Sequence, residues 1–241
     1  MEIDIEQRYK DFLSTISHEL RTPLTSIRGF ADTILMSYDK LSDEQKIKFV
    51  NIIKEQSNRL IDLVENILSI SKLDDVNISN FVFKPIYPET VLKSAISVLK
   101  AKYINYDFKI DNQAKDYQIY VDEAKLQQVF INLLENSAKY SPENNQINIC
   151  LKIINNKVAI NIRDFGIGIA PQNFEKIFEK FSRIDTPLTR KTEGSGIGLY
   201  ITKNLIEKMN GKITPLIVDK GACFEITFDI CTLQTPLEKK I

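Results

Sequence analysis

The first 73 residues carry apolar side chains at intervals of three and four, the spacing that places them on one face of an α-helix. The pattern breaks once, at residues 38–40, and therefore predicts two helices, over 5–38 and 43–73. Ser42 followed by Gln45 forms a capping box that supports the second start. Because two helices cannot bury both apolar stripes alone, we expect an antiparallel hairpin that forms a four-helix bundle as a dimer.

Beyond residue 80 the pattern becomes a mixture of strands and helices. Strands are expected near 81–84, 106–110, 117–121, 146–154, 157–163, 212–218 and 223–230, and helices over 88–102, 123–140 and 196–209. Asn155-Asn156 is a hairpin turn signal between two of the strands. This order predicts an α+β chain in which an α/β sandwich, with its helices on one face of the sheet, follows the hairpin.

The polar run 74–80 is interpreted as a connection between the two parts. We assign residues 1–75 to the helical domain, 76–80 to the linker, 81–232 to the α/β domain and 233–241 to a C-terminal tail.

Composition excludes several classes of function. Lys plus Arg and Asp plus Glu both number 32, so the chain lacks the basic excess of a dedicated nucleic-acid binder. No apolar run approaches the ~20 residues that span a bilayer. Cys150, Cys223 and Cys231 show no CxxC spacing, which favours reduced thiols in a cytosolic protein. The single histidine, His18, rules out a metal site with several histidines.

That histidine lies in the segment Ser-Thr-Ile-Ser-His-Glu-Leu-Arg-Thr-Pro-Leu, residues 14–24, of the first predicted helix. His18 is off the apolar stripe, and an exposed neutral imidazole can act as a nucleophile. Glu19 can hold one ring nitrogen and so activate the other. Thr22, one helical turn further on, can orient a water molecule toward a phosphoryl group. On its own such a His-Glu pair is typical of an ordinary helix surface.

A second candidate segment lies in the predicted helix 123–140. Asn132 and Asn136 are four residues apart and share one face of it. Their amide oxygens suit Mg²⁺, a hard cation that keeps several waters and bridges phosphates. Lys139 can add positive charge beside the same phosphates. The alternative for this segment alone is a helix with solvated amides.

Residues 164–168, Asp-Phe-Gly-Ile-Gly, follow a predicted strand. At the floor of a pocket, the Asp164 carboxylate can accept from the amino group of adenine and reject guanine, which has a carbonyl there. Gly166 and Gly168 allow tight turns and a close approach of the backbone to a ligand. Without other motifs, this pattern indicates only a turn.

Residues 194–199, Gly-Ser-Gly-Ile-Gly-Leu, open a predicted helix. Backbone N–H groups at a helix start, together with the helix dipole, favour a phosphate. The polar segment 183–193 before them contains Arg190 and is interpreted as a loop that covers bound nucleotide. Phe178 and Phe181 are expected to anchor the base of this loop to the core.

Together these segments resemble the sensor histidine kinases of two-component systems, from about residue 8 to 230. The resemblance covers five boxes in the family's order: a His box at 17–24, an Asn box containing Asn132, Asn136, Lys139 and Tyr140, a first glycine box at 164–168, a phenylalanine box at 178–181 and a second glycine box at 194–198.

The resemblance implies a dimerisation and histidine-phosphotransfer domain followed by a catalytic ATP-binding domain. It implies ATP and Mg²⁺ as ligands, autophosphorylation of His18, and transfer to an aspartate of a response regulator receiver domain. Glu19 is then the base that assists attack, and Thr22 acts in dephosphorylating the partner. The expected nucleotide-binding residues are Asn132, Asn136, Lys139, Tyr140, Asp164, Gly166, Gly168, Arg190, Gly194, Gly196, Gly198 and Leu199, with Asn136 and Asn132 at the metal.

The sequence departs from the family pattern at one position and leaves several alternatives. In the family a Ser or Thr often precedes the phenylalanine found here as Phe224, and Cys223 in its place removes any hydroxyl contact. Members normally have an upstream sensor region, so we expect either the cytoplasmic part of a membrane-anchored sensor or a separate sensor partner. The alternative functions are a module that binds ATP but only dephosphorylates a regulator, and a non-catalytic dimeric scaffold. Autophosphorylation within or between protomers is undecided.

Overall fold

The computed structural model of the protein describes residues 2–75, 81–180, 182, 184 and 196–231. The chain divides into two compact units, residues 1–75 and 76–241.

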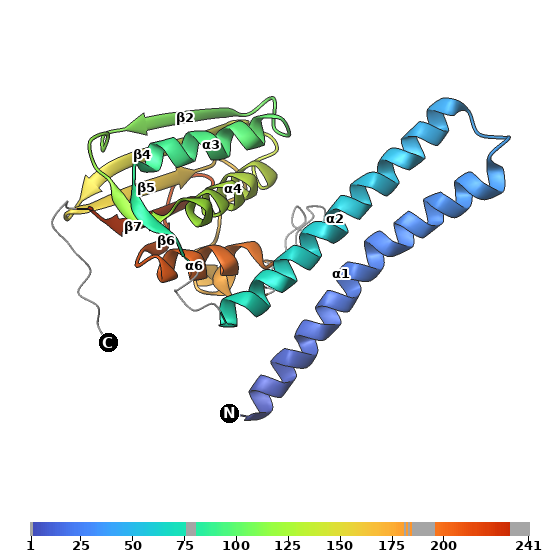
Figure 1. Cartoon of the computed structure of the whole chain (residues 1–241), viewed down its shortest axis with the longest axis horizontal. Coiled ribbons are helices and arrows are strands. Elements are labelled where there is room, and N and C mark those ends of the chain that lie inside the picture. The colour runs from blue at the N-terminus through green and yellow to red at the C-terminus, as the bar shows by residue number, and fades with distance from the viewer. Residues whose placement is uncertain (1, 76–80, 181, 183, 185–195, 232–241) are drawn as a thin grey trace. The chain divides into compact units, whose positions relative to one another are not determined.

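The first unit is a hairpin of two long helices, α1 (Glu2–Ser37) and α2 (Asp43–Asp75) (Figure 1). The predicted capping box is confirmed, because Ser42 Oγ accepts from Gln45 N at 3.2 Å and Gln45 Oε1 accepts from Ser42 N at 3.0 Å. The α2 helix includes Asp74 and Asp75, the first two residues of the polar run 74–80 that we interpreted as a connection, and 76–80 lie outside the described residues.

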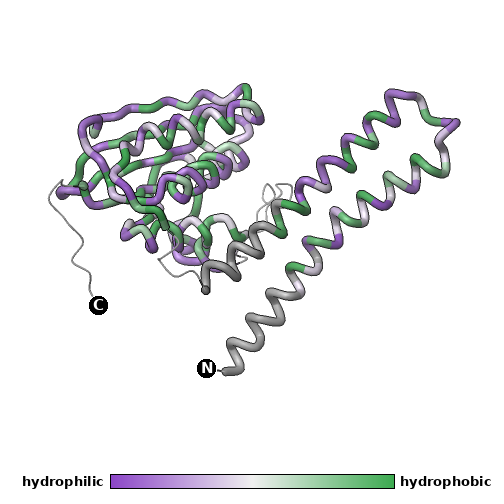
Figure 2. The backbone as a smooth tube through the Cα atoms, viewed as in Figure 1, coloured by the Kyte–Doolittle hydropathy of each residue, from purple (hydrophilic) through white to green (hydrophobic). Residues whose placement is uncertain are grey.

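Apolar residues recur along both helices, visible as green segments in Figure 2. Some of them meet inside the hairpin: Phe30 on α1 and Phe49 on α2 have ring centroids 5.2 Å apart. Pro23 lies within α1, which continues through it, and its side chain is buried. Leu63 on α2 is also buried, at 7% exposure. The helical stripes predicted from the sequence therefore form one interface within a single chain.

The second unit contains a two-stranded and a five-stranded sheet (Figure 1). The small sheet pairs β1 (Phe83–Ile86) antiparallel to β3 (Ile119–Asp122). The order of the large sheet is β2-β4-β5-β7-β6. Its strands are β2 (Asp107–Asn112), β4 (Gln146–Ile154), β5 (Lys157–Arg163), β7 (Cys223–Asp229) and β6 (Lys212–Leu216). The β2–β4 pair is parallel and the other neighbouring pairs are antiparallel.

The helices α3 (Pro88–Lys100), α4 (Glu123–Lys139) and α6 (Gly198–Lys208) lie along one face of the large sheet (Figure 1). Alternate side chains of the strands point into this layer. On β5, Val158, Ile160 and Ile162 are fully buried, as their alternation predicts. The sandwich with helices on one face is therefore confirmed.

The turn between β4 and β5 also follows the prediction. Asn155 and Asn156 have φ values of 49° and 59°, the left-handed conformation that a two-residue hairpin turn requires. Asn210, just after α6, likewise has a φ of 59°, and Gly211 N donates to Ile206 O at 2.9 Å, which closes the helix. Asparagine rather than glycine takes the left-handed position at this helix end.

Most of the strand predictions were wrong by one or two residues at their ends, and two of them show why. We expected a strand over 81–84, but β1 begins at Phe83, because its partner β3 ends opposite it at Asp122. We expected 212–218, but β6 ends at Leu216, which pairs with Cys223, the first residue of β7. In both cases the partner strand determines where pairing stops.

The three cysteines are free thiols, as expected from their spacing. Among the described residues, none of the helices combines the length and the apolar character that crossing a bilayer requires.

Candidate functional site

Asp164 follows the end of β5 and is buried, with 4% of its surface exposed. Its Oδ1 accepts hydrogen bonds from Gly166 N at 2.9 Å and Ala222 N at 3.0 Å. No described residue donates to Oδ2. Burial raises the pKa of this carboxyl, although the two backbone N–H donors act to lower the pKa. The carboxylate therefore has one oxygen fixed by the fold and one available to a ligand.

The glycines of this loop are needed because the backbone passes very close to two other segments, the end of α4 and the residues just before β7. A Cβ on Gly166 would lie 1.9 Å from Tyr140 O, and Ile167 N donates to the same oxygen at 3.2 Å. Gly168 has a φ of 73°, and a Cβ there would lie 2.8 Å from Gly221 O. The predicted site residue Gly166 thus packs against Tyr140 at the end of α4, whereas Gly168 packs against Gly221, just before β7.

Asn132 lies on the face of α4 that packs against α6. Its Nδ2 donates to Thr202 Oγ1 at 2.6 Å. A Cβ added to Gly198 would lie 2.4 Å from Asn132 Oδ1, so the amide lies directly against the backbone at the start of α6. Asn136 is one turn further along α4, and its side chain makes no hydrogen bond to another described residue. The structure therefore brings the two predicted site residues Asn132 and Gly198 together.

Lys139 lies in the last turn of α4, with its Nζ 3.8 Å from Glu135 Oε1. The same Glu135 oxygen accepts from Lys102 Nζ at 2.6 Å. Desolvation by burial acts to raise the pKa of Glu135, but the two lysines and Tyr103 outweigh it and the pKa is lowered. Lys139 thus already lies beside the Glu135 carboxylate. A bound phosphate would have to displace this carboxylate in order to pair with Lys139.

The start of α6 has the features of a phosphate site. Gly196 has a φ of 68°, and Gly198 is the first residue of the helix. No side chain caps this end, so its first N–H groups can meet an anion. Leu199 is half-buried in the first turn.

Several predicted residues lie outside what the structure describes. These are Arg190, Gly194, Phe181, most of the loop 183–193, and the side chain of His18. Phe178 is described, is buried at 8% exposure, and meets the ring of Phe224 at a centroid distance of 6.2 Å.

On the hairpin, Glu19 and Thr22 follow His18 along α1. Thr22 is exposed. Glu19 Oε2 lies 3.6 Å from a guanidinium nitrogen of Arg59 on α2. Arg59 carried no sequence signal, because its relation to the His box depends on how the two helices pack. Thr202 and Ala222 were missed for the same reason.

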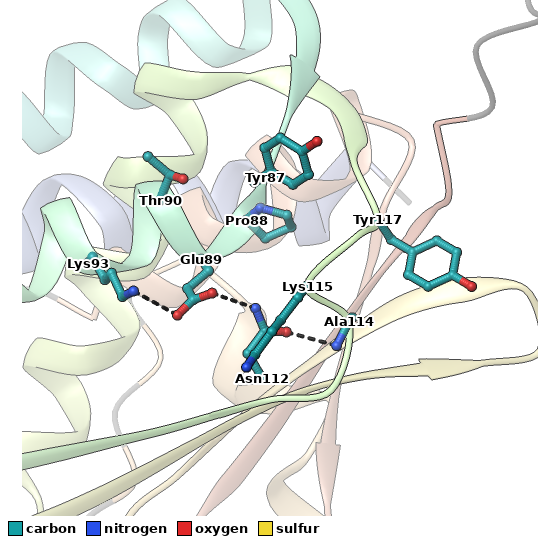
Figure 3. Close-up of a pocket in the computed structure, with 9 residues that line it drawn as sticks. All are labelled: Tyr87, Pro88, Glu89, Thr90, Lys93, Asn112, Ala114, Lys115 and Tyr117. Atoms are coloured by element: carbon teal, nitrogen blue, oxygen red, sulfur yellow. Dashed lines mark hydrogen bonds and ion pairs between the residues drawn. The ribbon is translucent and has the colours of Figure 1, made fainter.

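A separate cavity of about 240 Å³ lies at the start of α3 and the end of β2 (Figure 3). Glu89 is one of its lining residues and pairs with Lys93 at 2.8 Å and with Asn112 Nδ2 at 2.6 Å. These two partners lower the pKa of Glu89. None of the predicted nucleotide residues lines the cavity. Because its carboxylate is already satisfied by neighbours, we do not assign the nucleotide to it.

The donor set limits which metal can bind. Among the described residues, no group of three or more His, Cys, Asp or Glu side chains can hold a metal ion. A cation at Asn132 and Asn136 would therefore take amide oxygens from the protein and its other ligands from phosphate and water. That set fits Mg²⁺ and does not fit a structural zinc site.

Comparison with known families divides the chain in the same way as the structure. Residues 8–76 match the His Kinase A (phospho-acceptor) domain. Residues 121–231 match the family described as histidine kinase-, DNA gyrase B-, and HSP90-like ATPase. The first match covers the hairpin with His18, and the second covers the segments with Asn132, Asp164 and Gly198.

Individual histidine kinases are similar to this chain over both of these parts. The signal transduction histidine-protein kinase ArlS of Staphylococcus haemolyticus is 31% identical over 220 residues, which are 91% of this chain and 48% of ArlS. The chain thus spans about half the length of the curated relatives it matches. The histidine kinase ThkA, solved in complex with response regulator protein TrrA, is 26% identical with a TM-score of 0.70, over 94% of this chain and 64% of that one. Full-length ShkA, solved with AMPPNP, shares the fold at 24% identity and a TM-score of 0.66, over 94% and 47%.

Proposed function

The chain belongs to the sensor histidine kinases, with a phosphoacceptor domain followed by an ATPase-type catalytic domain, and we propose that it transfers the γ-phosphoryl group of ATP to His18 and then to an aspartate of a response regulator. The observation that carries the nucleotide half of this proposal is the Asp164 carboxylate. Its Oδ1 is held by two backbone N–H groups, while Oδ2 receives no bond from a described residue. A buried acceptor of this kind suits the amino group of adenine.

The protein groups have separate tasks in the proposed reaction. Asp164 holds the base, and the first N–H groups of α6 face the phosphates. Asn136 and Asn132 would hold Mg²⁺, which neutralises phosphate charge during transfer. Lys139 adds charge to the leaving ADP once it exchanges Glu135 for phosphate.

At the acceptor, neutral imidazole of His18 attacks the γ-phosphorus in line while the bond to the bridging oxygen of ADP breaks. Glu19 takes the hydrogen of the other ring nitrogen. Asn132 has no carboxylate with which to activate water, so transfer to His18 is favoured over hydrolysis.

A phosphatase activity toward the regulator is a second candidate function. It rests on Thr22, which is exposed on α1 four residues after His18. A homodimer through the hairpin, an upstream sensor input and a cytoplasmic location of the kinase core belong to the same proposal. The relatives that support it are about twice as long as this chain.

The proposal is tested by incubating the protein with labelled ATP and Mg²⁺. We expect phosphate that is labile in acid and stable in alkali, little steady-state ATP hydrolysis, and no label in His18→Gln. High ATP turnover in His18→Gln would show instead that the chain is an ATPase. Profiling transfer against the response regulators of the source organism then identifies the partner. Thr22→Ala, with the exposed Thr25→Ala as its control, separates phosphatase from kinase activity.

A further inference from the structure

We propose that Thr202 is a positioning residue that determines which end of the Asn132 side chain faces the bound nucleotide and its cation. Thr202 lies on α6 and is 1% exposed. Its Oγ1 accepts a 2.6 Å hydrogen bond from Asn132 Nδ2 on α4, across 70 residues of sequence. This inference rests on the proposed function, because it concerns the metal half of the same site.

The bond matters because a primary amide has two unlike ends. Its oxygen is an acceptor and a possible metal ligand, whereas its NH₂ group is a donor and repels a cation. The two ends are similar in size, so shape alone does not select between the orientations. A hydrogen bond in which Asn132 Nδ2 donates to Thr202 commits the nitrogen and leaves Oδ1 directed away from the hydroxyl.

Gly198 shows where the oxygen then lies. It is four residues before Thr202, one turn along the same face of α6. A Cβ on Gly198 would lie 2.4 Å from Asn132 Oδ1 but 3.1 Å from Cγ and Nδ2, so the oxygen is the nearest atom of the amide. Gly198 is also the first residue of α6, at the end where no side chain caps the helix. Asn132 Oδ1 therefore lies beside the first residue of α6, at the helix end that would receive the phosphates.

Asn136 offers a contrast on the same helix. Its side chain makes no hydrogen bond within the described part of the chain, so its amide is free to turn when a cation arrives. Asn132, by comparison, is set before binding by Thr202 and Gly198. Because Thr202 is closed to solvent, water cannot take over its role as acceptor. Removing the hydroxyl should therefore release the Asn132 amide.

The substitution Thr202→Val keeps the branched shape and removes the acceptor, while Thr202→Ser keeps the hydroxyl. We measure binding of AMPPNP by titration calorimetry, with Mg²⁺ and with EDTA. With Mg²⁺ we expect Thr202→Val to bind about two- to tenfold more weakly than wild type, the loss of one hydrogen bond, and Thr202→Ser to match wild type. With EDTA we expect all three proteins to bind alike.

The outcomes are separable. If Thr202→Val weakens AMPPNP binding equally with Mg²⁺ and with EDTA, Thr202 only supports packing. If Thr202→Val binds AMPPNP with wild-type affinity in Mg²⁺, Thr202 does nothing for the cation. Either result overturns the inference. If Thr202→Val does not fold, Thr202→Ala is held to the same expectation. Wild-type protein that binds no AMPPNP would instead overturn the proposed function itself.

Discussion

The two carboxylate oxygens of Asp164 have different surroundings. Oδ1 accepts from Gly166 N and Ala222 N at 2.9 and 3.0 Å, whereas no described residue donates to Oδ2. Gly166 lies in the same loop after β5, whereas Ala222, the residue before β7, is 58 residues from Asp164 in the sequence. The two N–H groups fix the plane of the carboxyl group, so the direction of the second oxygen is determined by the backbone. In the proposed function, base recognition by Asp164 therefore depends on the fold around it.

The substitution Asp164→Asn tests that view. The amide oxygen should replace Oδ1, because both backbone groups are donors, and this leaves the NH₂ end facing the base. A donor then meets the amino group of adenine, and we expect ATP affinity to fall by about 10- to 100-fold. Guanine has a carbonyl in that place, so GTP should gain relative to ATP. Competition binding with both nucleotides measures the change.

The control for this change is Asp229→Asn, an exposed aspartate that pairs with Lys157 at the far end of β7. It should leave both affinities unchanged. An equal loss of ATP and GTP binding in Asp164→Asn would indicate that Asp164 supports the loop and does not read the base.

Which functional residues the sequence identified depended on whether their chemistry can be read from neighbouring positions in the chain. Asn132, Asp164 and Gly166 were found because each lies in a short pattern whose chemistry can be read from neighbouring positions. Thr202 and Arg59 were not, because each matters only through a side chain on another helix. The partner of a polar side chain depends on tertiary packing, and no local spacing encodes it.

Strand pairs likewise differ: those formed by neighbouring segments were predicted, and those formed by distant segments were not. The alternation of β4 and β5 and the asparagine turn between them predicted both strands with their observed ends, since a hairpin is a local structure. The parallel pairing of β2 with β4 and the separate β1–β3 sheet were not predicted. Strands far apart in sequence can pair in several orders with the same alternation, so their arrangement depends on how the helices cover the sheet.

Two glycines in different elements give opposite expectations for the same change. Gly29 lies on α1, and a Cβ there meets nothing within 4 Å. Gly29→Ala should stabilise the hairpin by about 0.5–1 kcal/mol, because alanine loses less backbone entropy in a helix. Gly166→Ala should destabilise the catalytic unit by about 1–3 kcal/mol, since its Cβ would lie 1.9 Å from Tyr140 O.

Both variants can be followed in the full chain by denaturant unfolding, with nucleotide affinity as a second readout. Gly29→Ala should bind nucleotide normally, and Gly166→Ala should bind it weakly. Normal affinity and stability in Gly166→Ala would mean that the close approach to Tyr140 is not needed for the site.

At the scale of the whole molecule, the hairpin leaves a second apolar stripe uncovered. Ile47, Val50, Ile61 and Val64 on α2 are 62, 54, 55 and 43% exposed. Their spacings of 3, 11 and 3 place them at the a and d positions of two heptads, separated by one heptad in which Lys54 and Ser57 take those positions. Apolar a and d positions are the pattern of a helix that packs against another helix. The inner stripe containing Phe49 and Leu63 is already used within the chain. A second copy of the hairpin is the simplest partner for the outer stripe, as the four-helix bundle requires.

The substitution Ile61→Lys tests this assembly. A lysine there replaces apolar surface that would be buried twice in a symmetric dimer, and burial of one such side chain contributes about 1.5–3 kcal/mol. We expect the wild type to sediment as a dimer at micromolar concentration and Ile61→Lys to sediment as a monomer. Asn51→Lys adds the same charge at an exposed polar position of α2 outside the stripe and should remain dimeric. If Ile61→Lys stays dimeric with unchanged helix content, the subunits must meet through another surface. The outer stripe would then be available to a different helix, such as one from a sensor region.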